Sequence, residues 1–235
     1  MKILIYRSND VNIRRYSLFT EEIVEELKDY NIEITMEEES SLSLEKFKSA
    51  DLIIIFSHGN DWAIFHKLED QNGEEKPHYE TLITTKKRLD LLKGKKVLAF
   101  ACYTAIDYVG LGDVAVREAG CVSYLGFEGA INRHLPEEFI ENISGETEID
   151  VKNFISSVYS VVFKSTIIEA IKKNFTFDYF AKTLKLRLKQ QIAKQIINNF
   201  DGKIHIKFHT KGAKPVHETA DSIRIRGDMN VSFIA

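Results

Sequence analysis

The chain has 235 residues, of which 44% are hydrophobic and 29% charged, a balance typical of a soluble globular protein with one large domain or a domain and an extension. No stretch approaches the ~18 consecutive apolar residues of a membrane span, and a strand pattern rather than a signal peptide follows Met1. The two cysteines, Cys102 and Cys121, are too few for a disulfide framework. These features argue against membrane, secreted, fibrous and disordered classes, and we expect a reducing, cytoplasmic setting.

Charge is distributed unevenly along the chain. Residues 1–150 carry 17 Lys and Arg against 29 Asp and Glu, whereas residues 151–235 carry 15 against 6. The two parts therefore have opposite net charges, and we expect the basic tail to dock on the acidic body. Binding of the tail to an acidic partner such as nucleic acid is the alternative. It is less favoured, because the tail lacks a zinc pattern and an aromatic-rich basic motif.

The first half of the chain alternates between strand and helix patterns. Lys2–Tyr6 is a short β-rich run, and Thr20 is a candidate N-cap for an amphipathic helix. Residues 32–36 alternate between apolar and polar side chains. The continuous apolar runs at 51–57 and 96–102 predict strands buried on both faces, which is typical of a parallel sheet.

Between these two runs we expect a polar stretch over residues 60–80 and a helical segment that ends at Gly94. A helix over Leu111–Ala119 and a strand over Cys121–Phe127 follow. The alternation predicts the α/β fold class with a mainly parallel sheet.

The C-terminal part predicts three helices and further strands. The helices cover Val151–Lys164, a segment opened by a capping box at Thr166–Glu169, and Phe177–Phe200. Residues 204–208 alternate as in a strand. Residues 223–225 and 231–233 flank a Gly-Asp turn, which predicts a β-hairpin.

Two reactive side chains follow the buried apolar runs. His58 and Gly59 come directly after the first run, and Cys102 ends the second. Ligands and catalytic groups gather at the carboxyl ends of parallel strands, so neighbouring strands would bring the imidazole and the thiol to one crevice. Nucleophilic catalysis by cysteine needs a base and oxyanion donors. His58 fits the base, and the backbone N–H groups of Gly59 and Cys102 fit the donors, whereas each residue taken alone is typical of ordinary packing or a turn.

The sequence resembles the caspase-like cysteine proteases, including the CHAT, gingipain and clostripain-like relatives. The resemblance lies in the apolar runs ending in Ser57-His58-Gly59 and Ala101-Cys102, the segment Ala119–Gly126, and the helical region Phe154–Ile171. It implies a three-layer α/β/α sandwich with a six-stranded sheet and peptide hydrolysis by a His58–Cys102 dyad through an acyl-enzyme. It further implies a catalytic domain over 1–175, and a basic helical and β-hairpin extension over 176–235.

Residues around the cysteine depart from the caspase signature, because Phe100-Ala101-Cys102-Tyr103-Thr104 replaces Gln-Ala-Cys and its following residues. Phe100 also stands where metacaspases carry an acidic residue. The resemblance places the first specificity pocket just past the strand after the cysteine. There Glu128 is the candidate carboxylate for a basic substrate residue. Asp61 and Asp107 are weaker candidates, and an ordinary loop position for Glu128 is the alternative.

No pattern predicts a cofactor or metal. The loop after the first strand has no glycine, which excludes a dinucleotide fingerprint and a P-loop. The histidines outside the dyad lack ligand spacing, and Cys121 is expected to pack rather than react. We therefore expect a regulated cysteine endopeptidase acting on protein or peptide substrates, with no cofactor, no metal and no membrane, in a bacterial defence or cell-death context. A catalytically silent caspase-like adaptor and a doubly wound nucleotide sensor are the alternatives.

Overall fold

A computed structural model describes residues 1–38, 44–67, 79–131, 145–198 and 213–234. Its central feature is a six-stranded sheet in the order β2-β1-β3-β7-β8-β9. The strands are β1 (Lys2–Arg7), β2 (Glu33–Glu38), β3 (Leu52–Phe56), β7 (Lys96–Phe100), β8 (Ser123–Phe127) and β9 (Ile223–Gly227). All neighbouring strands run parallel except β9, which runs antiparallel to β8. The predicted α/β class with a mainly parallel six-stranded sheet is confirmed.

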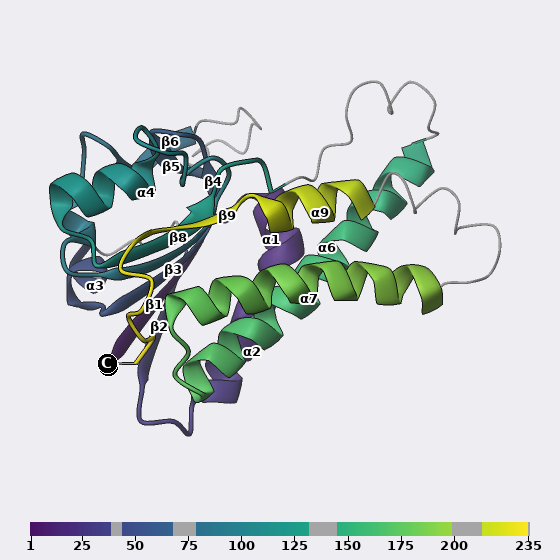
Figure 1. The fold of residues 1–235 in the computed structure, drawn as a ribbon, viewed down its shortest axis with the longest axis horizontal. Coiled ribbons are helices and arrows are strands. Elements are labelled where there is room, and N and C mark those ends of the chain that lie inside the picture. Colours follow the sequence, from purple (N-terminus) through teal and green to yellow (C-terminus); the bar gives the residue numbers. More distant parts are fainter. Residues whose placement is uncertain (39–43, 68–78, 132–144, 199–212, 235) are drawn as a thin grey trace, which may run out of the picture.

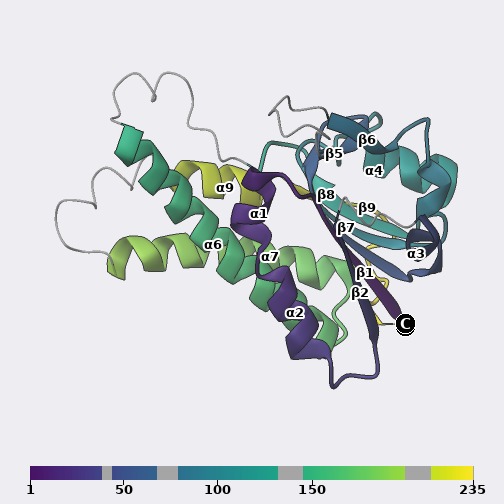
Figure 2. The ribbon, with the colours of Figure 1, turned by 180° about the vertical axis from the view of Figure 1, so that it is seen from behind.

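Helices cover both faces of this sheet. They are α1 (Val11–Ser17), α2 (Thr20–Leu27), α3 (Leu44–Ser49), α4 (Leu111–Val114), α6 (Gly145–Lys172), α7 (Phe177–Asn198) and α9 (Ala213–Asp221), with a 3-10 segment η2 (Leu89–Leu92) and a π-helical turn η3 (Ala115–Ala119). Figure 1 shows α3 and α4 on one side of the sheet and α1, α2, α6, α7 and α9 on the other. The view from behind in Figure 2 shows the same three layers.

The central strands are apolar along their whole length because both of their faces are buried. All five residues of β3 are fully covered. Ile54 and Phe56 belong to the larger core cluster beneath α6 and α7, whereas Ile53 and Ile55 belong to the cluster on the other face. The Phe56 and Phe100 rings stack at 4.5 Å between centroids, which joins β3 to β7. This two-sided burial accounts for the continuous runs in the sequence.

A second, three-stranded sheet lies where the sequence predicted only a polar stretch. Its strands are β4 (His58–Gly59), β5 (Ala63–Lys67) and β6 (Tyr79–Thr84), paired antiparallel in the order β4-β5-β6. The polar stretch predicted over residues 60–80 was wrong because Ala63 and Ile64 are fully buried in β5. The start of the segment predicted to be helical was also wrong, because β6 continues to Thr84 and buries Leu82 and Ile83. In Figure 1 this sheet lies beyond one end of the central sheet, and its first strand, β4, follows β3 after Ser57. It therefore holds the segment that contains His58.

The two helices predicted around Thr166 are one continuous helix, α6, of 28 residues. The capping box was a wrong interpretation, because the Thr166 hydroxyl donates to the Val162 carbonyl oxygen at 2.6 Å, one turn back within the helix. Ile167, Ala170 and Ile171 continue the buried face beyond it. Burial of this face outweighs the local capping signal.

The segment 153–172 of α6 is long and apolar enough to cross a membrane, with a mean hydropathy of 1.4 in its most apolar window. However, 61% of that window is buried inside the protein. The helix packs against α1, α2 and α7, which is the environment of a core helix.

The C-terminal strands do not form the expected β-hairpin. Residues 223–227 pair with β8 instead, and Ser232 forms a bridge with Thr176 near the start of α7. The edge of β8 offers backbone groups with which β9 pairs. Phe233 inserts between Phe177 and Phe180 in the core. The segment after residue 175 thus completes the central sheet, and the domain boundary at 175 stays a prediction. The strand expected at 204–208 lies outside the described residues.

Basic residues after position 150 pair with acidic residues before it. On the α6 side, Lys164 lies 2.5 Å from Glu22, and Lys172 lies 3.5 Å from Glu26. The β9 arginines make similar pairs with the loops at the sheet end. These contacts agree with docking of the basic part on the acidic body.

Candidate active site

The ends of β3 and β7 lie side by side. The two strands are parallel neighbours, with Phe56 opposite Phe100 in the last paired position, and the Ser57 N–H donates to the Phe100 carbonyl oxygen at 3.4 Å. His58 and Cys102 each follow their last paired residue by two positions. The topology therefore brings both residues to the same edge of the sheet, as the sequence predicts for neighbouring strands.

Gly59 packs directly against the backbone that carries the thiol. A Cβ atom at this position would lie 2.9 Å from the Cys102 carbonyl oxygen and 2.9 Å from the Ala101 Cβ, which is closer than such atoms approach. Only glycine fits without displacement of one of the two segments. The segment His58–Gly59 and the segment around Cys102 are thus in contact.

The Cys102 thiol is half-buried, unlike the alanine before it, which is fully covered. The backbone N–H of Ile131 donates to Cys102 Sγ at 3.3 Å. A hydrogen-bond donor at this distance favours the thiolate, which is the nucleophilic form of cysteine.

Cys121 has the opposite environment. It is 4% exposed, and its thiol donates to the Lys95 carbonyl oxygen at 3.3 Å. Burial raises the pKa of Cys121 to about 12, which keeps this thiol protonated and unreactive near neutral pH. The two cysteines are therefore chemically distinct, and the packing role expected for Cys121 agrees with its burial.

Asp10 is a site residue that the sequence analysis missed. Its carboxylate oxygen Oδ1 lies 3.1 Å from His58 Nε2, and the side chain is 4% exposed. Asp10 follows β1, which is the other neighbour of β3, so three adjacent strands supply Asp10, His58 and Cys102. The signal available in the sequence was an acidic residue just past the first strand.

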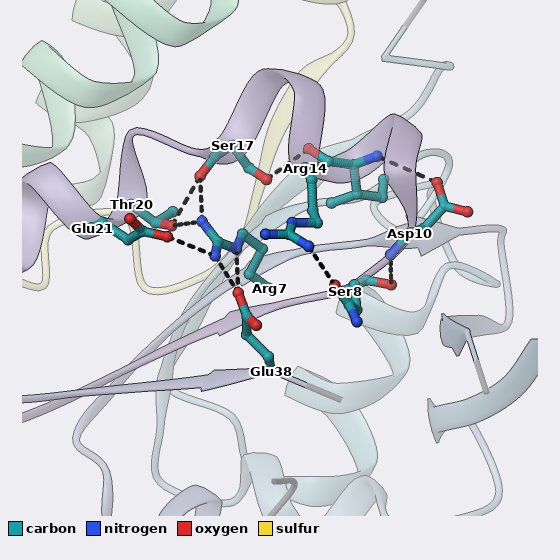
Figure 3. Close-up of polar contacts among 10 residues, drawn as sticks. Arg7, Ser8, Asp10, Arg14, Ser17, Thr20, Glu21 and Glu38 are labelled. Carbon is teal, nitrogen blue, oxygen red and sulfur yellow. Dashed lines mark hydrogen bonds and ion pairs between the residues drawn. The ribbon is translucent and has the colours of Figure 1, made fainter. Parts of the chain in front are cut away.

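Local hydrogen bonds fix the Asp10 carboxylate. The Ile13 N–H at the start of α1 donates to Oδ1 at 3.3 Å, and the Asp10 N–H donates to the Ser8 hydroxyl at 3.5 Å. Figure 3 shows Asp10 between the end of β1 and the first turn of α1. The carboxylate is thus oriented before any substrate binds.

Arg7 anchors the same end of β1 from the other side. Its side chain is 1% exposed, and its guanidinium contacts Glu38, Glu21 at 3.0 Å and the Thr20 hydroxyl at 3.0 Å (Figure 3). Two carboxylates compensate the buried charge, because an unpaired buried guanidinium would be strongly unfavourable. Arg7 therefore joins β1, β2 and α2 next to the loop that carries Asp10.

The carboxylates expected in the specificity pocket are engaged by β9. Glu128 lies 2.7 Å from Arg224 Nη2 and 3.2 Å from Arg226 Nη2, and Asp107 lies 2.7 Å from Arg226 Nη1. Arg226 thus joins Glu128 and Asp107. Asp61 has an exposed side chain, and its carbonyl oxygen accepts the Leu111 N–H at 2.7 Å. A basic substrate residue would compete with these arginines for Glu128.

His66 on β5 is buried, whereas His58 is partly exposed. Its ring lies 3.2 Å from Glu80 across the β5–β6 pair, and desolvation lowers the pKa of His66 below its usual value. Within the described ranges, no group of three His, Cys, Asp or Glu side chains could hold a metal ion. His78, His134, His205 and His209 lie outside those ranges.

A surface hollow of about 670 Å³ lies away from this edge. Lys93, Arg117 and Gly120 are among its lining residues, and it sits at the amino ends of β7 and β8. Cys102 is at the carboxyl end of β7, so this hollow does not contain the candidate catalytic residues.

Comparison with known proteins gives little further support. No protein-family model and no curated protein match the chain. One solved structure, a secreted C11 cysteine protease from Bacteroides thetaiotaomicron in complex with an irreversible peptide inhibitor, aligns over 54% of this chain with 13% identity and a TM-score of 0.35. The alignment covers 48% of that protease, so this chain spans about half its length. This weak likeness does not assign an activity, and the functional interpretation depends on the geometry above.

Proposed function

We propose that the protein is a cysteine endopeptidase with Cys102 as nucleophile and His58 as general base. The observation that carries this proposal is the parallel pairing of β3 and β7, which brings His58 and Cys102 to one sheet edge. The contact of Gly59 with the Cys102 backbone and the partial exposure of Cys102 add to it.

The reaction begins when His58 takes the proton of the Cys102 thiol. The thiolate attacks the carbonyl carbon of the substrate peptide bond, and the developing oxyanion accepts hydrogen bonds from the Gly59 and Cys102 N–H groups. When the C–N bond breaks, His58 returns the proton to the leaving amine and a thioester remains on Cys102. Water, deprotonated by His58, then attacks the thioester and releases the carboxylic acid and the free thiol.

Asp10 is a positioning residue for this chemistry. With its carboxylate at Nε2 of His58, Nδ1 is the nitrogen that exchanges the proton with Cys102 Sγ. The carboxylate also stabilises the imidazolium that forms when the thiol loses its proton. Its burial strengthens this interaction, because surrounding apolar groups exclude water.

The substrates are peptides or proteins, and Glu128 remains the candidate residue for recognising a basic side chain. The arginines on β9 reduce the free negative charge that Glu128 offers. Selectivity for Arg or Lys is therefore expected to be smaller than for an unpaired carboxylate.

The proposed activity is tested with a fluorogenic peptide library and a cysteine-directed active-site probe. The purified protein should cleave a subset of the library and carry one equivalent of probe on Cys102. Cys102→Ala and His58→Ala should abolish cleavage, whereas Cys121→Ala, the matched thiol control, should retain it. Equal loss of cleavage in both cysteine variants would show that the thiol is misassigned. Lack of cleavage across the library, with an unlabelled Cys102, would favour the silent adaptor.

A further inference from the structure

The arginines of β9 face the loop that follows Cys102. In the β8–β9 ladder, Tyr124 lies opposite Arg226 and Gly126 lies opposite Arg224. A Cβ atom on Gly126 would lie 2.8 Å from the Thr104 hydroxyl, so the loop after the cysteine lies directly on this face of the sheet. We call residues 102–110 the Cys102 loop.

Arg226 contacts this loop at two points. Its Nη2 group donates to the Ala105 carbonyl oxygen, and its Nη1 group lies 2.7 Å from Asp107. The same Nη2 group lies 3.2 Å from Glu128, which follows β8. The Arg226 side chain is only 14% exposed, and Glu128 is less exposed than Asp107, so solvent screens the contact with Glu128 less than the contact with Asp107. One guanidinium thus links the Cys102 loop to the segment after β8.

These two segments determine the environment of the thiol. The Tyr103 N–H donates to the Gly129 carbonyl oxygen at 3.1 Å, and the Ala105 N–H donates to the Phe127 carbonyl oxygen at 3.0 Å. Two residues further on, Ile131 supplies the N–H that donates to Cys102 Sγ. A shift of one segment relative to the other would therefore change the donor distance at the sulfur.

The Cys102 loop needs external support to keep its conformation. Tyr103 and Tyr108 have φ angles of 60° and 66°, in the left-handed region that residues other than glycine rarely adopt. Such conformations persist only where surrounding contacts impose them. Arg226 supplies contacts at Ala105 and Asp107, between the two strained positions.

We propose that Arg226 is a positioning residue that holds the Cys102 loop against the segment 128–131, and thereby sets the hydrogen bond from Ile131 to the reactive sulfur. The inference rests on the proposed function only in taking Cys102 as the reactive thiol. The planar fork of arginine, with several fixed donors, matches acceptors on two segments at once, whereas lysine offers one compact charge.

Arg224 provides a matched comparison on the same strand. Its guanidinium also contacts Glu128, but its other partners are the carbonyl oxygens of Asp221 and Ile223 beside it. None of these described partners belongs to the Cys102 loop. Removal of Arg224 therefore deletes a positive charge from the same face without releasing the loop.

The experiment measures the alkylation rate of Cys102 by iodoacetamide at about pH 7.5, in a Cys121→Ala background that leaves one thiol. Arg226→Met and Arg226→Lys should both lower the rate, by about fivefold or more, because the sulfur loses its fixed N–H donor and with it part of the thiolate. Arg224→Met should stay within about twofold of the parent.

Global loosening is monitored separately. Alkylation of Cys121 in a Cys102→Ala background reports opening of the fold, and Arg226→Met should leave this buried thiol protected. A Cys102 rate that is unchanged or raised in Arg226→Met would overturn the proposal. The parental alkylation rate in Arg226→Lys would also overturn it, because a positive charge alone would then be sufficient. Because alkylation needs no peptidase activity, the proposal can stand or fall independently of the proposed function.

Discussion

The carboxylate of Asp10 lies 3.1 Å from His58 Nε2, at the shared edge of β1 and β3. Asp10→Asn keeps an oxygen acceptor for the Ile13 N–H but removes the negative charge beside the imidazole. We expect kcat for peptide cleavage to fall on the order of 10-fold to 100-fold, with little change in KM, because general-base assistance weakens.

The matched control for this change is Arg14→Gln on the exposed side of α1, where Arg14 contacts Asn9 rather than the imidazole. Its kcat should equal that of the parent. Thermal melts of both variants should agree within about 3 °C of the parent. A proportional loss of kcat in Arg14→Gln, or no loss in Asp10→Asn, would remove Asp10 from the mechanism.

The two cysteines should separate activity from stability. Cys102→Ala should abolish cleavage and probe labelling while leaving Tm nearly unchanged, because the half-buried thiol contributes little packing. Cys121→Ala should keep full activity and lose about 1 kcal/mol of unfolding free energy, or about 2–4 °C in Tm, because its side chain is buried. Kinetics and melts of both variants test this pair. A larger loss of activity in Cys121→Ala than in Cys102→Ala would contradict the assignment.

The sequence predicted the central sheet well because the strands of that sheet are recognisable from their amino-acid composition. A strand such as Leu52–Phe56, which is buried on both faces, must be apolar throughout. The residues that follow such a strand then lie at the edge of the sheet. The edge location of His58 and Cys102 was therefore predictable from local patterns.

Long-range contacts limited the rest of the prediction. The pairing of β9 with β8 joins residues about 100 positions apart, and a local Gly-Asp turn favoured a hairpin instead. The roles proposed for Asp10 and Arg226 depend on partners from distant parts of the chain, His58 and Glu128. Side-chain identity at such positions carries no periodic signal, so pattern analysis could not assign them.

His66 should make stability depend on pH. Burial lowers its pKa, so below the unfolded-state value of about 6.5 the unfolded chain binds a proton that the folded protein does not. Unfolding free energy is therefore lost as pH falls below about 6.5, by at most about 1.4 kcal/mol at pH 5.5 from this group. His66→Gln should reduce that loss relative to the parent.

Denaturant titrations at about pH 7.5 and about pH 5.5 measure the effect, and the exposed His217 on α9 provides the matched control. His217→Gln should keep the parental pH dependence. If His66→Gln and the parent lose equal stability on acidification, the ring is not held neutral in the β5–β6 pair.

Substitution of Glu128 tests the substrate preference. If its carboxylate recognises a basic side chain, Glu128→Gln should lower kcat/KM for Arg and Lys substrates by more than it lowers kcat/KM for apolar substrates. An unshared, desolvated carboxylate would give a loss of about 2–5 kcal/mol. Arg224 and Arg226 already occupy both oxygens, so a substrate cation must displace the more exposed Arg224, and we expect a selective loss nearer tenfold, about 1.4 kcal/mol.

Asp61→Asn and Asp107→Asn are the comparisons for that measurement, because each removes a candidate carboxylate from a different loop. A larger selective loss of kcat/KM in either variant would show that the specificity pocket is formed by that loop. A library profile that favours Asp, or Leu and Met, would contradict recognition of a basic residue. Glu128 would then serve only as the partner of the β9 arginines, and its loss would act through Arg226 on the Cys102 loop, lowering kcat/KM equally for every substrate.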